Sequence, residues 1–242
     1  MSPDLERLHV QRQTGFRLDA RGRLKGVNSP EDARPPRFVL AGCAEGNLAS
    51  VSVDLDEATA IELLSLAREE PPFWPAGAAP HHLGRYLALL AARDAEVELD
   101  HEMEPDRPPF PAPAIVVASD TAEGQALLES LRRSGMPAGL FNMGFVDVGE
   151  FWAPWCAAVV SGEVASIAFA ARLSDAGAAV GVATSPAFRG RGLAAAAVAA
   201  WTRLPALARR RLFYSRRLSN RASKGVVDRL GLRAFGLTLT IF

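Results

Sequence analysis

The sequence predicts an α/β protein in two parts, and three observations lead to this prediction. Strand and helix patterns alternate over residues 114–242 in the order β-α-(α)-β-β-β-α-β-α-β, which is typical of helices packed on a sheet. Prolines cluster between residues 105 and 113 and predict a stiff, extended connection. Hydrophobic residues make up 49% of the 242 residues, enough for a sizeable core. We therefore expect a small α+β domain over 1–110 and a second domain over 114–242.

The first domain is expected to contain two strand pairs, two helices and a further strand. Alternating apolar residues and turn signals predict the strands, and apolar residues at helical spacing predict the helices. The expected strand pairs are 16–19 with 24–27 and 38–41 with 48–53, the helices are 56–69 and 82–92, and the last strand is 95–101.

Nothing in this first domain indicates a chemistry. His81 and His82 are adjacent, and neighbouring residues on a helix point in different directions, so a catalytic or metal-binding pair is not expected. The domain could cover an acceptor site, mediate dimerisation or be a decayed copy of the second domain. No internal repeat in the sequence supports the last of these roles.

The second domain begins with a strand pattern over 114–119, which we expect to be buried, and a helix over 122–134 capped by Asp120 or Thr121. Residues 135–155 are rich in glycine and aromatic residues and predict an irregular segment. The remaining elements are a hairpin of 156–160 with 164–173, a strand ending at 184, a helix from 193, a strand over 212–215 and a helix over 219–231.

The most informative stretch, residues 181–197, joins the end of a strand to an alanine-rich helix through an Arg-Gly-Arg-Gly loop. The first N–H groups of a helix lack partners within the helix, and the helix dipole places positive charge there, so such a junction binds anions. Gly190 and Gly192 allow close approach of the backbone, while Arg189 and Arg191 supply charge and forked donors. The stretch therefore predicts a pyrophosphate site.

Other interpretations of this loop are weaker. A P-loop needs Gly-x-x-x-x-Gly-Lys-Ser/Thr, which the sequence lacks, since its only lysines are Lys25 and Lys224. The spacing Gly190-x-Gly192-x-x-Ala195 fits a dinucleotide fingerprint, but the glycines do not follow the strand directly, and residues 208–217 contain no acidic residue to hold a ribose. The plain alternative is an ordinary strand–turn–helix whose glycines ease the bend.

The loop, in the run Pro-Ala-Phe-Arg-Gly-Arg-Gly-Leu-Ala over 186–194, resembles motif A of the GNAT N-acetyltransferase superfamily. Downstream, Asn220-x-x-Ser223 followed by Leu-Gly-Leu resembles a second segment of that family, in the same order. The resemblance covers 114–242 and is closest to the FR47-like branch. It implies a mixed central sheet with flanking helices, and acetyl-CoA as the acyl donor for an amine-bearing acceptor.

The resemblance also implies which residues bind the coenzyme. A backbone N–H at Val182–Ala183 would stabilise the developing oxyanion. Asn220 would contact the pantetheine arm and Ser223 would lie near the phosphates or the sulfur, although Asn220 could simply cap its helix. The implied set is Val182, Ala183, Thr184, Arg189, Gly190, Arg191, Gly192, Leu193, Ala194, Asn220 and Ser223.

At the catalytic positions the chain departs from the family. Ala183 stands where FR47-like relatives commonly carry Glu, and Val227 stands where many GNAT enzymes carry a Tyr acid. Glu150, or Asp147 beside it, could act as a base through water, and Tyr214 could act as an acid if its side chain faces inward. We therefore carry two hypotheses: an N-acetyltransferase, and an acyl-CoA-binding sensor or regulatory protein that has lost catalysis.

Composition limits the partners. The 27 basic and 27 acidic residues give a formal net charge of zero, so no overall field attracts nucleic acid or a membrane surface. Two cysteines without metal-ligand spacing predict neither a disulfide framework nor a metal site. The sequence has no apolar stretch of membrane-spanning length and no signal-peptide pattern, so a cytoplasmic location is expected.

Overall fold

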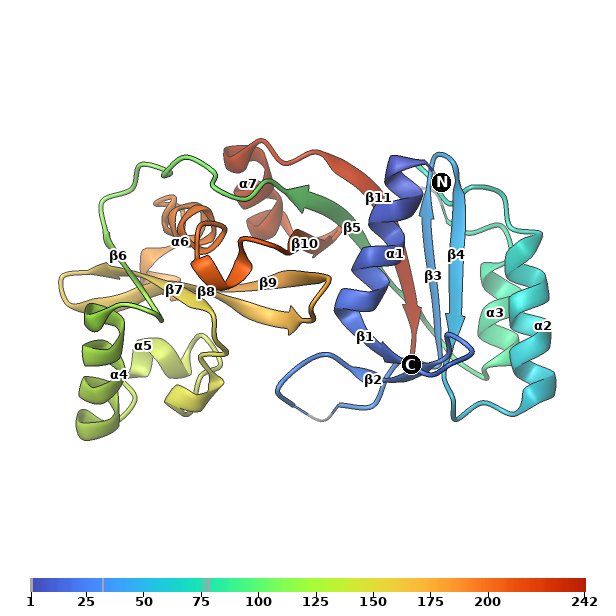
Figure 1. Cartoon of the computed structure of the whole chain (residues 1–242), viewed down its shortest axis with the longest axis horizontal. Helices are drawn as coiled ribbons and strands as arrows, with labels where there is room; N and C mark the ends of the chain where they lie inside the picture. The colour runs from blue at the N-terminus through green and yellow to red at the C-terminus, as the bar shows by residue number, and fades with distance from the viewer. Residues whose placement is uncertain (1, 32, 76, 78) are drawn as a thin grey trace.

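The computed structural model describes residues 2–31, 33–75, 77 and 79–242, and its centre is one large mixed sheet (Figure 1). Within this described part, nine strands follow the order β4-β3-β11-β5-β10-β9-β8-β7-β6. Among them, β9 and β10 are parallel and the other neighbours are antiparallel. The strands are β3 (Phe38–Cys43), β4 (Gly46–Val51), β5 (Glu96–Met103), β6 (Ile115–Ala118), β7 (Trp155–Val160), β8 (Glu163–Leu173), β9 (Gly177–Thr184), β10 (Arg211–Arg217) and β11 (Ala234–Ile241).

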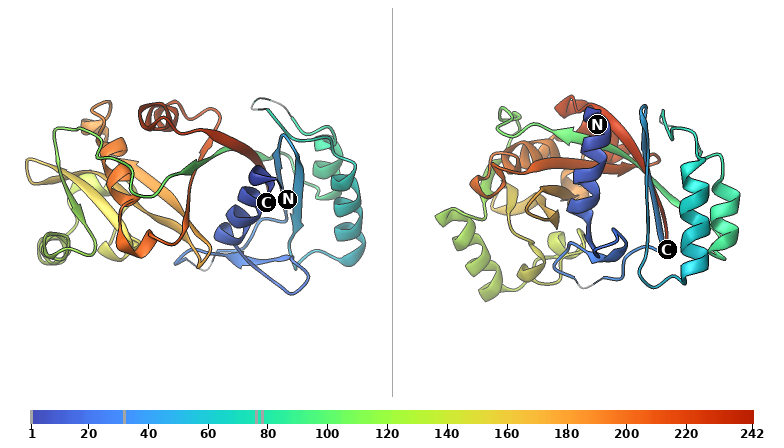
Figure 2. Two further views of the ribbon diagram at one scale, coloured as in Figure 1. Left: turned by 45° about the horizontal axis from the view of Figure 1, so that its top comes forward. Right: turned by 45° about the vertical axis from the view of Figure 1, so that its right-hand side comes forward.

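Helices cover both faces of this sheet (Figure 2). Strand alternation assigns the faces, because Met103 packs with α6 and α7 while Leu99, four residues earlier on β5, packs with α2 and α3. Phe213 packs with α1 on the other face, where α4 and α5 also lie. The helices are α1 (Pro3–Gly15), α2 (Glu57–Arg68), α3 (Leu83–Leu89), α4 (Ala122–Ser134), α5 (Ala138–Phe141), α6 (Leu193–Trp201) and α7 (Arg221–Leu230). The predicted fold class, a mixed sheet with flanking helices, is confirmed.

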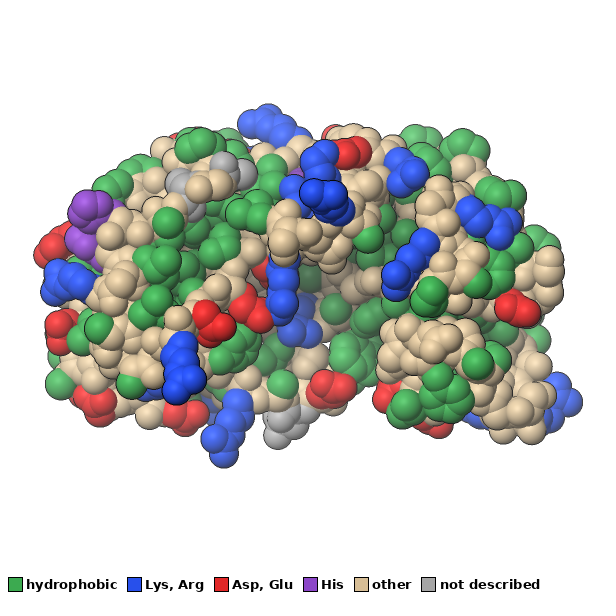
Figure 3. Space-filling view, turned by 180° about the vertical axis from the view of Figure 1, so that it is seen from behind, with side chains coloured by type: hydrophobic (Ala, Val, Ile, Leu, Met, Phe, Trp, Pro, Cys, Tyr) green, Lys and Arg blue, Asp and Glu red, His purple; other side chains and the backbone are tan. Residues whose placement is uncertain are grey.

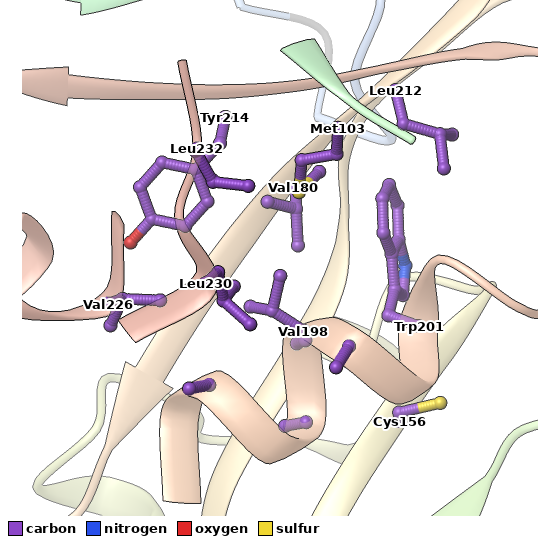
Figure 4. Packing of buried hydrophobic residues seen from close by; sticks show 14 of the residues in the cluster. Met103, Cys156, Val180, Val198, Trp201, Leu212, Tyr214, Val226, Leu230 and Leu232 are labelled. Carbon is purple, nitrogen blue, oxygen red and sulfur yellow. The ribbon is translucent and has the colours of Figure 1, made fainter. Parts of the chain in front are cut away.

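The alanine-rich helix α6 packs against the strands that form the candidate site. Its alanines from 195 to 199 are buried, and their small side chains let the helix axis approach the sheet closely. Val198 and Trp201 extend from α6 into the cluster that Val180 and Leu212 complete (Figure 4). The Trp201 indole N–H donates to the carbonyl of Pro154 at 2.8 Å, so its polar atom is satisfied within the core. This packing holds the N-terminus of α6 in a defined place.

The two predicted domains share one sheet. The strand β5 comes from 1–110, yet it lies between β10 and β11, which come from 114–242. Strands β3 and β4 extend the same sheet beyond β11. The proline-rich segment that suggested the boundary is therefore a connection between two strands of a continuous sheet. That each segment folds as a unit of its own stays a prediction.

Helix α1 is not predicted by the sequence pattern, which indicates only the hairpin of β1 (Phe16–Leu18) and β2 (Leu24–Val27) in this region. Leu8 is the only hydrophobic residue of α1 that is fully buried, so the helix carries no broad apolar stripe. Its start is nevertheless encoded locally, because the Ser2 side chain accepts from the Leu5 N–H and proline occupies the first helical position. Contacts with the sheet stabilise the remainder.

Strand β6 differs from the prediction of a buried strand. It lies at the edge of the sheet beside β7, and the side chain of Ile115 is 73% exposed. An apolar run of four residues has the same pattern whether it is central or at an edge, because only its neighbours determine burial.

None of the described helices is long and apolar enough to cross a membrane. The surface seen from behind is hollowed near its middle, with Lys and Arg side chains around the hollow (Figure 3).

Candidate coenzyme-binding site

The two parallel strands β9 and β10 separate in the middle of the sheet. They pair only from Gly177 and Arg211 to Ala179 and Phe213. Beyond these residues β9 continues along β8, and β10 continues along β5. Each strand therefore leaves its backbone groups on one side without a strand partner, and the sheet opens between them.

Backbone alternation determines which N–H groups face this opening. The Ser185 N–H donates to the carbonyl of Ala165 at 3.0 Å, on the side of β8. Successive residues of an extended strand point to opposite sides, so the N–H groups of Val182 and Thr184 face the opening. Of the predicted pair Val182–Ala183, it is Val182 that presents its backbone donor there.

The loop after β9 leads through a short 3₁₀ turn (Pro186–Phe188) into α6. Gly190 and Gly192 both have φ of +79°, a backbone conformation that favours glycine. A Cβ at Gly192 would lie 3.0 Å from a ring carbon of Phe110, so this position is also restricted sterically. Gly192 is the N-cap of α6 and offers no side chain to the helix. The first N–H groups of α6 are therefore free to bind an anion.

Arginine side chains surround this helix N-terminus. Arg189, Arg191, Arg221 and Arg229 line the cavity, and no Asp or Glu is among the described residues of its lining. The guanidinium of Arg229 donates to the carbonyl of Gly190 at 3.5 Å, and that of Arg191 lies 5.4 Å from the centre of the Phe188 ring. No described residue forms an ion pair with any of the four. The cavity is therefore strongly positive and suited to phosphate groups.

Helix α7 closes the other side of the cavity. The Asn220 side chain accepts from the Ser223 N–H at 3.0 Å, so it caps α7 in the way that the plain interpretation of this residue predicts. Asn220 also lines the cavity, so the cap and a ligand contact are compatible. The Ser223 hydroxyl lies 2.8 Å from the hydroxyl of Tyr214.

Tyr214 extends from β10 on the same face of the sheet as α6 and α7. Its ring is buried in the central cluster, and its hydroxyl is directed away from Val180 and Met103 (Figure 4). Burial raises the pKa of this hydroxyl, so it keeps its proton at neutral pH. The sequence left the direction of Tyr214 open, and the structure places it in the lining of the cavity.

The cavity has a volume of about 580 Å³, and all eleven residues of the predicted coenzyme set line it. Glu150 is not among the lining residues, because its carboxylate accepts from the N–H groups of Val146 and Asp147 and so caps a short helical turn. The Asp147 carboxylate is likewise bound to the N–H of Gly149. Val227 is buried in the core below the cavity. The candidate base is therefore engaged in a local cap.

Some residues of the lining carry no prediction from the sequence. Arg221, Gly225 and Arg229 recur every four residues on α7, so they share one face of the helix, and that spacing could have grouped the two arginines with each other. Asn142 and Met143 follow α5 and carry no such signal, because only the tertiary fold brings that loop to the mouth of the cavity. Among the described residues, no group of three or more His, Cys, Asp or Glu could hold a metal ion.

No protein-family model matches the sequence, and no curated protein matches it. A GCN5-related N-acetyltransferase from Kribbella flavida is similar in structure, with 18% identity and a TM-score of 0.40. That alignment covers 66% of this chain and 64% of that protein, less than two thirds of its length. An acetyltransferase of the GNAT family from Colwellia psychrerythraea aligns over 99% of this chain and 96% of its own, with 14% identity and a TM-score of 0.41.

A tandem GNAT protein from the clavulanic acid biosynthesis pathway aligns over 98% of this chain and 95% of its own. Its identity is 15% and its TM-score is 0.43. Because these identities are below 25% and these TM-scores are below 0.5, the similarities carry no argument about what this chain binds or does. The residues and geometry of the cavity are therefore the basis for inferring its function.

Proposed function

We propose that this protein is an acetyl-CoA-dependent N-acetyltransferase that transfers the acetyl group to the amine of a small molecule or protein. The observation that carries the proposal is the uncapped N-terminus of α6 at Gly192. It opens into an arginine-lined cavity at the point where β9 and β10 separate. The resemblance of the Arg189–Gly192 loop and of the Asn220–Ser223 segment to the GNAT superfamily supports the same conclusion.

The residues of the cavity suit each part of the coenzyme. The N–H groups at the start of α6, together with Arg189 and Arg191, would hold the pyrophosphate. The backbone donors that β9 leaves unpaired in the opening would bind the extended pantetheine arm, as a further strand would. The volume of about 580 Å³ lies in the range of cofactor sites.

The reaction requires the acceptor ammonium to lose a proton before its nitrogen attacks the thioester carbonyl carbon. The C–S bond then breaks, the thiolate takes a proton, and one proton is released for each amide formed. In this proposal the Val182 N–H would stabilise the oxyanion, and the protonated Tyr214 hydroxyl would supply the thiolate proton; both residues line the cavity. Since no described residue of the lining is a carboxylate, the group that accepts the amine proton would come from outside this lining, and positioning of the two substrates would supply much of the rate.

The test is calorimetric binding of acetyl-CoA to three proteins: the wild type, a double variant with Gly190→Asp and Gly192→Asp, and Gly162→Asp. Gly162 is a matched control, because its φ is +83° but it lies in the turn between β7 and β8. We expect the wild type and the control to bind, and the double variant to bind at least about 100-fold more weakly, because two carboxylates would face the phosphates. Absence of binding to correctly folded wild type would contradict the proposal.

The second candidate function is that of an acyl-CoA-binding sensor or regulatory protein without catalysis. Ala183 at the position of the usual base, and the engagement of Glu150 in a local cap, favour it. Amine-dependent release of free CoA thiol separates the two functions. Release above the rate of thioester hydrolysis supports the transferase, and tight binding without release by any amine supports the sensor.

A further inference from the structure

A second cavity, of about 320 Å³, lies on the opposite face of the same strands, between α1 and the sheet. Strand alternation relates the two cavities, because Tyr214 lines the coenzyme cavity while Ser215, the next residue of β10, lines this one. On β9, Ala179 belongs to this cavity and Val182 to the coenzyme cavity, and three residues of strand span about 10 Å. The two cavities therefore lie on opposite faces of the same part of the sheet, next to the opening between β9 and β10.

Two carboxyl groups of β5 face this second cavity. Asp100 is completely buried and accepts from the hydroxyls of Ser215 at 2.7 Å and Thr238 at 2.6 Å. The carboxylate of Glu98, two residues earlier on the same face, has no hydrogen bond or ion pair to any described residue. Burial raises the pKa of both carboxyl groups, that of Asp100 to about 7. A carboxylate in such a place is stabilised by a cation that enters the cavity.

Two arginines line the same cavity, and neither forms an ion pair with a described carboxylate, although the charge of Glu31 also acts on Arg172. Arg172 donates to the carbonyl of Ala171, and the charge of Glu98 acts on it, yet the two form no ion pair within 4.0 Å. Arg12 donates to Ser50 at 3.2 Å, while its Nε atom is buried without a hydrogen-bond partner. The Oε1 atom of Gln11 is also buried and unpartnered. Buried polar groups are normally satisfied, so these atoms indicate a polar ligand.

The cavity thus holds groups of opposite sign, and among the described residues Glu98 and Asp100 form no ion pair with Arg172 or Arg12. Glu96 at its edge is already paired with Arg217, and Arg34 is exposed. Glu98 with Asp100 suits an ammonium group, and Arg172 with Arg12 suits a carboxylate. A molecule that carries both groups a short distance apart would satisfy both pairs at once, whereas a simple amine or a simple acid would satisfy one pair only.

We propose that this cavity binds the acyl acceptor and that the acceptor is an α-amino acid. Its ammonium group would lie on the carboxylate of Glu98, with the buried Asp100 behind it, and its carboxylate would lie on Arg172 and Arg12. The role as acceptor rests on the proposed transferase function, whereas the class of ligand rests on the cavity alone. The residues come from α1, β5 and β8, so the segment 1–110 supplies most of the specificity for the amine.

The experiment is a calorimetric titration of the full-length protein, without acetyl-CoA, with each of the twenty common L-amino acids. Each one that binds is compared with its analogue that lacks the carboxylate and its analogue that lacks the amine. We expect at least one amino acid to bind, and both of its analogues to bind at least tenfold more weakly. Binding of none of the twenty, or equal binding of an analogue, would overturn the proposal.

Glu98→Gln and Arg172→Gln test the residues, with Glu163→Gln at the exposed start of β8 as control. Each of the first two is expected to weaken the amino acid at least tenfold and to leave acetyl-CoA affinity unchanged, which also shows that the variant is folded. If neither weakens it, the assignment of the cavity is wrong. The variant with Gly190→Asp and Gly192→Asp should keep amino-acid binding. If the wild type binds an amino acid but does not bind acetyl-CoA, the transferase function is refuted, whereas the ligand class of the second cavity is not.

Discussion

The two cavities of this protein lie on opposite faces of the same strands, yet they are built in different ways. All described lining residues of the first, the proposed coenzyme cavity, fall between 142 and 229, and the anion site proposed there includes backbone N–H groups at a helix N-terminus. The second cavity takes residues from α1 at the beginning of the chain to β11 at its end, and its polar groups are side chains. Their charges differ too. The charged side chains among the described lining residues of the first cavity are all arginines, whereas the second cavity has both acidic and basic side chains.

The two cavities depend in different ways on the rest of the fold. A helix N-terminus and a glycine loop are contiguous, so they keep their geometry wherever their helix is packed. A cavity of buried charges requires several strands in one register, because each charged group depends on partners from other segments. Binding of the coenzyme should therefore survive changes that abolish the second cavity, provided that the sheet itself persists.

The most severe way to test this comparison is to remove residues 1–110. The remaining fragment, 111–242, keeps every described residue of the coenzyme cavity, but it loses β5, which pairs with β10 from Leu212 to Arg217 and also with β11. We expect the fragment to lack a cooperative thermal transition by circular dichroism, because two strands lose their partners in the middle of the sheet. Supplying 1–110 as a separate chain is the control. A fragment that folds and binds acetyl-CoA alone would instead support two independent domains.

Asp100→Asn tests the second cavity through pH. Burial raises the pKa of Asp100 from 3.8 to about 7, so between these values the folded protein binds a proton that the unfolded chain has released. Wild-type stability should therefore fall as pH rises from about 4 to about 7, by at most about 1.4 kcal/mol per unit from this group. The variant lacks this dependence, so it should gain relative to wild type as pH rises. Urea unfolding at about pH 4 and about pH 7 measures the free energy of unfolding of both proteins, and the exposed Asp175→Asn is the control. If the difference between Asp100→Asn and wild type is the same at both pH values, the raised pKa of Asp100 is refuted.

Tyr214→Phe tests whether the Tyr214 hydroxyl in the coenzyme cavity acts as the proposed acid. Loss of the proposed acid should lower kcat by about 100-fold, in the usual range for one proton-transfer group, while acetyl-CoA affinity stays close to that of the wild type. Tyr86→Phe is the matched control, because Tyr86 is also buried and its hydroxyl donates to Glu70, far from the cavity. Steady-state kinetics and calorimetry give both quantities. Equal kcat values in the two variants would exclude Tyr214 as the acid.

The smallest effect is expected at two helix caps. Asn220 caps α7 beside the coenzyme cavity, and Asp56 caps α2 by accepting from the Thr59 N–H at 2.9 Å. Replacement of either by Ala should lower the free energy of unfolding by about 1 kcal/mol. Only Asn220→Ala should also weaken acetyl-CoA, as calorimetry would show. Equal acetyl-CoA affinity in the two variants would mean that Asn220 is a cap and nothing more.

Prediction from the sequence succeeded where the signal is local. The hairpins, helices α4 and α7 and the loop at Gly190 and Gly192 follow from turn residues, caps and periodicity within a short window. It failed for α1, whose buried face is too narrow to give a pattern, and for β6, whose exposure depends on its place in the sheet. Glu150 has the chemistry of a base, but its carboxylate is used by neighbouring N–H groups. Residue type alone does not show such engagement.

The conformation of the loop at Gly190 and Gly192 could be predicted from the sequence, because glycines, arginines and a helix start that adjoin in the chain also adjoin in space. The sequence also determined the alternation of strands and helices that leads to an α/β protein. Only the tertiary structure decided that β5 enters the sheet between β10 and β11, and that Glu98 and Asp100 thereby face Arg172 and α1 across a cavity. The physical reason is that strand order and register are settled by packing between distant segments, and a pattern of alternating residues is the same for every partner a strand could take.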